Sequence, residues 1–279
     1  MNNNLKTAML LAAIGGLMIV VGGLAGGTGG AVIGMAIGFV FVGGSYWFSD
    51  KVAIKAAKAV EVTEAQMPQY YAIVADLARR ADMPMPKLYV SPDPQPNAFA
   101  TGRSPKHAAV CVNQGILDVL SWDELQGVLA HEISHVRNRD ILIGSIAAAV
   151  AMGIMFLARM AMFSSMFGGR RRGGIGSSLA LMFLAPMAAG LLQMALSRSR
   201  EFEADRHGAR LLGTGEPLAS ALEKLERGVR AVPSNVNPAQ AQAYIANPLA
   251  GRKTQFGNRF STHPPMDERI RRLRTGEWQ

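Results

Sequence analysis

The sequence is poor in several features that mark common classes of protein. It has one cysteine, Cys111, among 279 residues, which excludes a fold held together by disulfide bonds. Charged residues reach only 18%, below the roughly 25% of a typical soluble domain. The 49% of hydrophobic residues excludes intrinsic disorder. The shortage of charge is therefore a property of particular segments of the chain.

Acidic residues are scarcer than basic ones, with 20 Asp and Glu against 29 Lys and Arg, so the net charge is +9. The surplus is divided along the chain: residues 50–140 hold 10 basic and 11 acidic residues, and residues 198–279 hold 14 and 9. No segment forms a single basic domain, and basic clusters that flank apolar segments are typical of membrane topology. We therefore expect no nucleic-acid partner.

A charge-free stretch runs from Thr7 to Ser49 and is interrupted by the glycine-rich residues 26–30. The apolar segments on either side, residues 5–25 and 31–48, have about 20 residues each, and a helix of that length crosses a hydrocarbon layer of roughly 30 Å. The sequence therefore predicts a transmembrane hairpin of two helices over residues 1–49. A cleaved signal peptide is the alternative for the first segment, but a second apolar segment follows it at once.

Positive charge flanks this hairpin at its two ends and is absent from its turn. Lys6 precedes the hairpin, and Lys51, Lys55 and Lys58 follow it. Because cytoplasmic flanks carry an excess of Lys and Arg, both ends of the hairpin should face the cytoplasm.

Two further apolar runs, residues 141–158 and 173–197, lie in the second half of the chain. Between them are three consecutive arginines at 170–172, which belong on the cytoplasmic side and conflict with a simple crossing. Residues 141–197 are therefore expected to form a second hydrophobic hairpin that is either spanning or re-entrant.

The remaining residues, 50–140 and 198–279, are more polar and form the two parts of one predicted domain. In the first part we predict a helix over residues 64–81, a strand over 87–90, a hairpin of strands over 97–101 and 107–112, and a helix from Trp122 to about Asp140. The last helix begins with a capping box formed by Ser121 and Glu124. Prolines just before the hairpin suit an edge strand. In the second part we predict helices over 198–212, 217–232 and 266–274, and a long loop over 233–258.

The helix that begins at Trp122 carries His131-Glu132-Ile133-Ser134-His135. Positions i and i+4 share a helix face, so both imidazoles can reach one ion at about 2.0–2.1 Å. Glu132 lies within reach of an attacking water and is the expected general base. The pattern is a signature of zinc metalloproteases, and its alternative is a solvated helix with polar residues. A purely structural zinc site is disfavoured because such sites are usually rich in cysteine.

A catalytic zinc site needs a third protein ligand, and the predicted helix over residues 198–212 offers two i, i+4 pairs. Glu201 and Asp205 form one pair, and Glu203 and His207 form the other on a different face. A site of this kind needs one carboxylate to bind the metal and another to orient a histidine. The spacing leaves the choice between the pairs open, and His207 is more commonly a structural residue.

Three motifs, residues 131–135, 199–205 and 261–265, resemble in their order the HtpX family of bacterial heat-shock membrane metalloproteases, relatives of the membrane CaaX prenyl proteases. The resemblance covers essentially the whole chain. It implies that Glu201 is the third zinc ligand and that Asp205 lies behind it and contacts His131.

The same resemblance places His263, in the last motif, near the active site. Its implied role is to stabilise the oxyanion or to occupy the open zinc position in a resting state.

We therefore expect an α-helical integral membrane protein with a cytoplasmic α+β, zincin-like metalloprotease domain that contains the HExxH helix and a small antiparallel sheet. It should bind one Zn²⁺ per chain and be a multi-pass protein of the bacterial inner membrane, with its active site on the cytoplasmic side. Its expected substrates are misfolded or membrane proteins, as in stress-response quality control. A prenylated CaaX protein is the alternative substrate, and would need a cavity built from more spans. An extended substrate should pair with the edge strand, whose residues are Asn97, Ala98, Phe99, Ala100 and Thr101.

Overall fold

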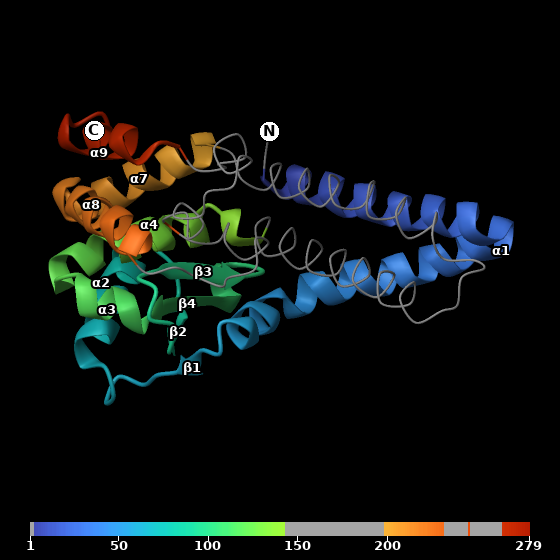
Figure 1. Cartoon of the computed structure of the whole chain (residues 1–279), viewed down its shortest axis with the longest axis horizontal. Helices are drawn as coiled ribbons and strands as arrows, with labels where there is room; N and C mark the ends of the chain where they lie inside the picture. Colours follow the sequence, from blue (N-terminus) through green and yellow to red (C-terminus); the bar gives the residue numbers. More distant parts are fainter. Residues whose placement is uncertain (1–2, 143–197, 232–244, 246–263) are drawn as a thin grey trace.

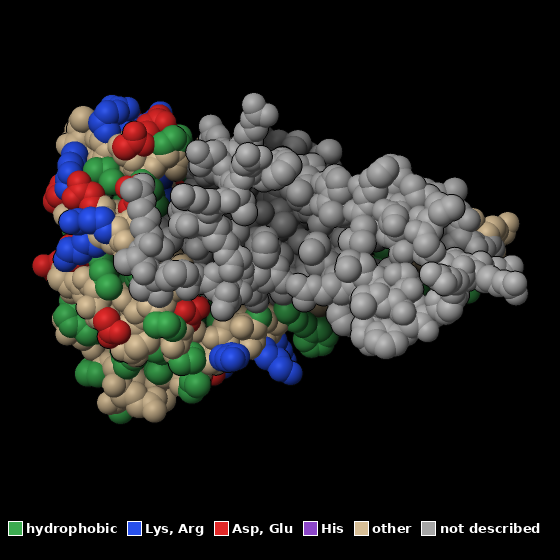
Figure 2. Space-filling model, in the orientation of Figure 1, with side chains coloured by type: hydrophobic (Ala, Val, Ile, Leu, Met, Phe, Trp, Pro, Cys, Tyr) green, Lys and Arg blue, Asp and Glu red, His purple; other side chains and the backbone are tan. Residues whose placement is uncertain are grey.

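The computed structural model describes residues 3–142, 198–231, 245 and 264–279, and these form a helical arm joined to a body of one sheet and several helices (Figure 1). The expected second hairpin, nearly all of the loop over 233–258, and His263 lie outside the described residues. Figure 2 shows charges of both signs over the body, and Lys or Arg side chains beside apolar ones where the arm meets it.

The arm is α1 (Asn3–Ala56), which doubles back on itself near Gly27, where φ is +60°. A glycine adopts this left-handed conformation at little cost. The two halves of α1 lie side by side, since a Cβ at Gly38 would be only 3.1 Å from the Cβ of Met18. The helix continues to Ala56, seven residues past the expected end of the hairpin. Judged by length, hydropathy and charge together, no helix in the described part of the chain qualifies as a membrane span.

The sheet has the strand order β1 (Val60–Glu61), β2 (Lys87–Ser91), β4 (Ala108–Asn113), β3 (Ala98–Gly102). The expected β3–β4 hairpin is confirmed, with Phe99 opposite Cys111 in an antiparallel pair. The prediction of an antiparallel sheet is wrong for its centre, where β2 and β4 run parallel and Leu88 lies opposite Val110. Strand β3 follows β2 in the chain but does not pair with it. Strand β4 lies between β2 and β3, and β3 is at an edge of the described sheet.

The helices of the body follow the expected pattern with shifted ends. Helix α2 (Pro68–Arg80) begins four residues later than predicted, because Pro68 takes the first helical turn, where its missing N–H costs nothing. The capping box of α4 (Trp122–Arg137) is confirmed, and α4 ends before Asp140 because Arg139 adopts a φ of +60°. The other helices are α3 (Gln114–Val119), α7 (Arg198–Leu212), α8 (Glu216–Ala231), α9 (Met266–Arg274) and the short 3-10 helix η1 (Pro105–His107).

Helix α4 is the centre of the body, and β3, α7 and α8 pack around it. Its buried side chains, such as Leu129 and Ile133, join the main hydrophobic core. A glycine permits each close helix contact. A Cβ at Gly127 of α4 would lie 2.4 Å from the backbone nitrogen of Leu218 in α8. A Cβ at Gly208 of α7 would lie 3.0 Å from the backbone nitrogen of His131 in α4. Helix α7 is therefore held directly against the turn of α4 that carries the first histidine.

Candidate active site

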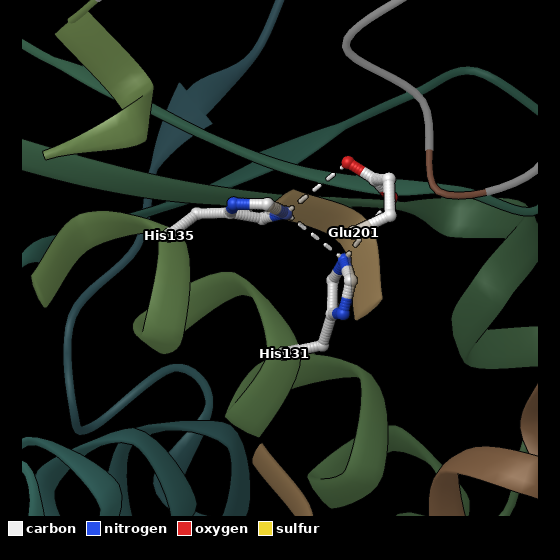
Figure 3. Close-up of side chains that lie close together, drawn as sticks. All are labelled: His131, His135 and Glu201. Atoms are coloured by element: carbon white, nitrogen blue, oxygen red, sulfur yellow. Dashed lines mark hydrogen bonds and ion pairs between the residues drawn. The ribbon is translucent and has the colours of Figure 1, made fainter. Parts of the chain in front are cut away.

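Three side chains from α4 and α7 point toward one another in the centre of the body (Figure 3). The Nε2 atoms of His131 and His135 are 3.1 Å apart. Carboxylate oxygens of Glu201 lie 3.7 Å from Nε2 of His131 and 3.5 Å from Nε2 of His135. One ligand atom from each residue lies within 4.8 Å of the other two.

These distances fit a single metal ion. Tetrahedral ligands at bond lengths of about 2.0–2.1 Å are roughly 3.3 Å from one another. The three nitrogen and oxygen separations bracket that value, and two imidazoles with one carboxylate form a donor set used by catalytic zinc. When both rings are neutral and carry their proton on Nδ1, each Nε2 presents only a lone pair and neither can donate to the other. A cation bound by both nitrogens would remove this repulsive contact.

A buried carboxylate and a buried guanidinium hold the ring of His131 from behind. Asp205, one helical turn after Glu201, has its Oδ1 2.9 Å from Nδ1 of His131. Arg269 of α9 donates to both oxygens of Asp205, at 2.7 Å and 2.8 Å, and its side chain is fully buried. Arg269 also donates to the carbonyl of Ile245 at 3.3 Å. The arrangement fixes the ring so that Nε2 faces Glu201.

His135 has a corresponding carboxylate on its own Nδ1. Asp140, just beyond the end of α4, places Oδ2 3.2 Å from that nitrogen and is only 8% exposed. Arg200 of α7 has its Nη1 3.9 Å from the other oxygen of Asp140. Both histidines therefore direct Nδ1 to an acid and Nε2 to the shared centre, which is the tautomer a metal-binding histidine needs.

Glu132 lies between the histidines in sequence and is buried against the sheet, with 5% of its surface exposed. The backbone N–H of Ala100 in β3 donates a hydrogen bond to its carboxylate. Burial raises the pKa of Glu132 to about 7, and the nearby charge of Glu201 acts in the same direction. Glu132 of the motif is therefore in direct contact with the edge strand β3.

The electrostatics of the site differ between its two histidines, because burial, together with the charges of His135 and Arg269, lowers the pKa of His131. Burial alone would lower the pKa of His135, but the hydrogen bond to Asp140 and the charges of Glu201 and Glu132 raise it to about 9. At Asp205 the effect of burial is overcome by Arg269, which lowers the pKa of the carboxyl to about 2. The environment that stabilises an imidazolium at His135 also stabilises a metal cation at that ring.

The structure brings Glu201 and Asp205 to the histidines and leaves the other pair of α7 outside. Glu203 and His207 face each other at 3.2 Å, and His207 contacts Asn138. The rotation of α7 about its own axis decides which of the two pairs faces the histidines. The spacing of residues along the helix does not specify that rotation.

Sequence reasoning missed Arg269 and Asp140. Arg269 had a signal, because it falls between Met266 and Leu273 on the apolar stripe of a short helix, where a charge requires a buried partner. Asp140 follows the motif by five residues and was taken only as the end of the helix. Its contact depends on how the chain turns after α4.

A helix with two histidines and a glutamate, in contact with a second helix that supplies a carboxylate, has the arrangement of a metallopeptidase centre. Residues 64–277 match the model of Peptidase family M48, and the chain belongs to this family. It is a metalloprotease.

Two curated relatives are similar over their full length, and a solved structure shares the fold. "Protease HtpX homolog" of Burkholderia mallei (strain SAVP1) and that of Burkholderia pseudomallei (strain K96243) are each 50% identical over 289 residues, covering 100% of both chains. The resemblance to HtpX drawn from the motifs is thus confirmed. The crystal structure of S. mikatae Ste24p matches with a TM-score of 0.55 and 20% identity, over 97% of this chain and 65% of that chain.

Proposed function

We propose that this protein is a zinc endopeptidase anchored in the bacterial inner membrane, where it hydrolyses peptide bonds of misfolded or membrane proteins at the cytoplasmic face. The convergence of His131, His135 and Glu201 with Glu132 beside them is the observation that carries the proposal.

In this proposal, His131, His135 and Glu201 would hold one Zn²⁺. The ion, when bound, supplies a Lewis acid that polarises the scissile carbonyl and acidifies water. Asp205 keeps the proton of His131 on Nδ1 and so keeps Nε2 available as a ligand. Asp140 does the same for His135.

Glu132 is the general base of the reaction. Its carboxylate takes a proton from the attacking water and delivers it to the amine of the departing peptide, so no covalent acyl-enzyme forms. The hydrogen bond from Ala100 fixes the carboxylate toward β3, where a substrate carbonyl would lie.

The substrate binds as an extended strand along the outer edge of β3, which pairs with no further strand among the described residues. Residues alternate along an antiparallel strand between those whose backbone groups face the partner and those whose groups face outward. Asn97 faces β4, because its carbonyl accepts from the N–H of Asn113 at 2.8 Å, and the N–H of Ala100 faces Glu132. The outward set is therefore Ala98, Ala100 and Gly102. Of the five residues expected for this strand, Asn97, Phe99 and Thr101 have the opposite, inward parity.

Main-chain pairing of this kind reads the backbone of a peptide more than its side chains. A protease that recognises substrates in this way accepts many sequences once they are unfolded. This breadth suits the clearance of damaged proteins.

Support for a membrane anchor comes from apolar side chains along the second half of α1. Ile33 is 61% exposed, Phe39 83% and Val40 73%, and neighbouring apolar residues are more than half exposed. A contiguous exposed patch of this kind is typical of a surface covered by lipid or protein. The lysines that follow the patch support a location of its C-terminal end at the cytoplasmic surface.

The decisive experiment is Glu132→Gln in the full chain purified in detergent. We expect the variant to retain one zinc per chain, measured by metal analysis, and to lose casein cleavage by at least about 100-fold. Glu203→Gln makes the same chemical change on an exposed face of α7 and should leave both quantities unchanged.

Unchanged cleavage in Glu132→Gln, or loss of both zinc and fold, would contradict the role of this residue as the base. Wild-type protein that contains no zinc, or that cleaves casein equally well with a chelator, would contradict the zinc mechanism itself.

A further inference from the structure

A cavity of about 520 Å³ lies where the C-terminal end of α1 meets the sheet. It is remote in sequence from the catalytic motifs and is lined by side chains of α1, β2, η1 and β4. The residues that matter here are Asp50, Lys51, Lys55, Lys87, Tyr89 and Lys106. Its size falls within the range of small-molecule sites, about 300–1,000 Å³.

Four lysines from three elements converge on this cavity. Lys51 and Lys55 follow the apolar part of α1, and the orientation rule for membrane proteins explains them. Lys87 of β2 and Lys106 of η1 lie more than 30 residues further along the chain, where that rule requires no positive charge. Only folding brings them to the same cavity, so the cluster is a property of the tertiary structure.

Acidic groups balance only part of this charge. Asp50 lines the cavity, and Glu61 of β1 accepts from Lys87 at 3.0 Å and from Tyr89 at 3.1 Å. Within the part of the chain that the structure describes, Lys87 is the one lining lysine with an ion-pair partner within 4.0 Å. Lys51, Lys55 and Lys106 therefore direct exposed positive charge toward one space.

The cavity lies next to aromatic side chains at the end of the apolar patch. Trp47 and Phe48 are 56% and 53% exposed, one helical turn before Lys51. The guanidinium of Arg103 lies 4.7 Å from the ring centroid of Trp47, and Lys51 Nζ lies 5.5 Å from that of Phe48. Exposed aromatic rings followed by basic groups are characteristic of the interface between lipid tails and headgroups.

We propose that this cavity binds the phosphate of an anionic phospholipid headgroup and so docks the protease body against the membrane surface. The inference rests on the membrane anchor proposed above, and adds a lipid ligand to it. The lysines bind the phosphate diester, and Trp47 and Phe48 contact the upper part of the lipid chains. Docking of the body in this way would hold the edge strand β3 at a constant height above the bilayer.

The test is native mass spectrometry of the full-length protein in a neutral detergent, with phosphatidylglycerol or phosphatidylcholine added at equal concentration. We expect wild-type protein to retain phosphatidylglycerol in preference to phosphatidylcholine. Each lysine at a membrane surface contributes a factor of about five, so Lys55→Gln with Lys106→Gln should weaken phosphatidylglycerol retention about 25-fold.

A matched control removes two positive charges elsewhere, at Arg79 of α2 and Arg227 of α8, both changed to Gln. It should retain phosphatidylglycerol within about twofold of wild type, since single exposed charges far from a site contribute little. Equal retention of both lipids by wild type, or unaltered retention by the double lysine variant, would overturn the proposal. Displacement of the lipid by millimolar inorganic phosphate would overturn the assignment to a headgroup and indicate a site for a small free anion.

Two further measurements separate this proposal from those on which it rests. Glu132→Gln should retain phosphatidylglycerol as wild type does, even though its cleavage is lost. The double lysine variant should remain in the membrane fraction of cells and should cleave casein in detergent at the wild-type rate. Absence of the wild-type protein from the membrane fraction would refute the anchor. Wild-type protein that stays in that fraction but does not retain phosphatidylglycerol in preference to phosphatidylcholine would refute the headgroup site alone.

Discussion

The replacement Arg269→Met tests how the metal-binding histidine is held in place. Arg269 is fully buried and donates to both oxygens of Asp205, which in turn contacts Nδ1 of His131. Methionine fills the space of the aliphatic part of arginine and has no charge, so the variant keeps most of the packing around that part of the side chain. It leaves the carboxylate of Asp205 buried without its principal cation.

The expected cost follows from that uncompensated charge. Breaking a buried ion pair by removing one partner costs about 3–5 kcal/mol. A change of 1 kcal/mol shifts the melting temperature of a chain of this size by about 2–4 °C, so Arg269→Met should melt roughly 6–20 °C below wild type. Zinc affinity should also fall, by about 10–100-fold, because Asp205, which orients the ring of His131, is no longer held by Arg269.

Thermal unfolding should be measured in detergent with excess chelator, so that the change in metal binding does not enter the melting temperature. Arg271→Met is the control, since Arg271 lies on the same helix with its side chain 55% exposed and pairs only with Glu277 in the described residues. We expect less than about 1 kcal/mol from it. The double variant Arg269→Met with Asp205→Asn should recover part of the loss, because neither charge then remains. Equal melting temperatures for Arg269→Met and Arg271→Met would refute the reasoning.

Three other changes test separate parts of the structure. Asp140→Asn removes the negative charge that holds Nδ1 of His135, and we expect zinc affinity, measured by chelator competition, to fall about 10–100-fold. The metal-free protein should also melt at a lower temperature at neutral pH, because the interaction by which Asp140 raises the pKa of His135 is lost. Gly208→Ala inserts a Cβ 3.0 Å from the backbone of His131, so it should separate α7 from α4, cost about 1–3 kcal/mol in thermal unfolding and weaken zinc binding. If Gly208→Ala kept wild-type zinc affinity, the site would tolerate a larger separation of α7 from α4. Ser121→Ala removes the side chain that caps α4 and should lower stability by about 1 kcal/mol without changing the zinc content; a large loss of zinc would contradict a purely capping role.

Much of the site could be predicted because it depends on local geometry. The separation of His131 and His135 by one helical turn follows from their positions in the chain, provided that the segment is helical. The capping box at Ser121 and Glu124 indicated that it is, and indicated where the helix begins. The C-terminal end of α7 and the first residue of α9 were predicted for the same reason, because the signals at Gly213 and after Pro265 act within a few residues.

The parts that were missed depend on contacts between distant segments. Strands β2 and β4 pair in parallel because β4 lies between β2 and β3 in the sheet. No short window of sequence contains that strand order. The contact between Arg269 and Asp205 joins residues 64 positions apart. Asp140 reaches His135 only because the chain turns sharply at Arg139.

By itself, the sequence determined the chemistry that this protein has available: two histidines on one helix face, a glutamate beside them, and an apolar N-terminal hairpin followed by lysines. The tertiary structure decided which face of α7 meets those histidines. Gly208 lets α7 approach the backbone of α4 closely, and in that position Glu201 and Asp205 point inward while Glu203 and His207 point away. The tertiary structure also decided that lysines from β2 and η1 share a cavity with those of α1. Helical periodicity acts within a few residues, whereas the rotation of one helix against another depends on the packing of the whole core.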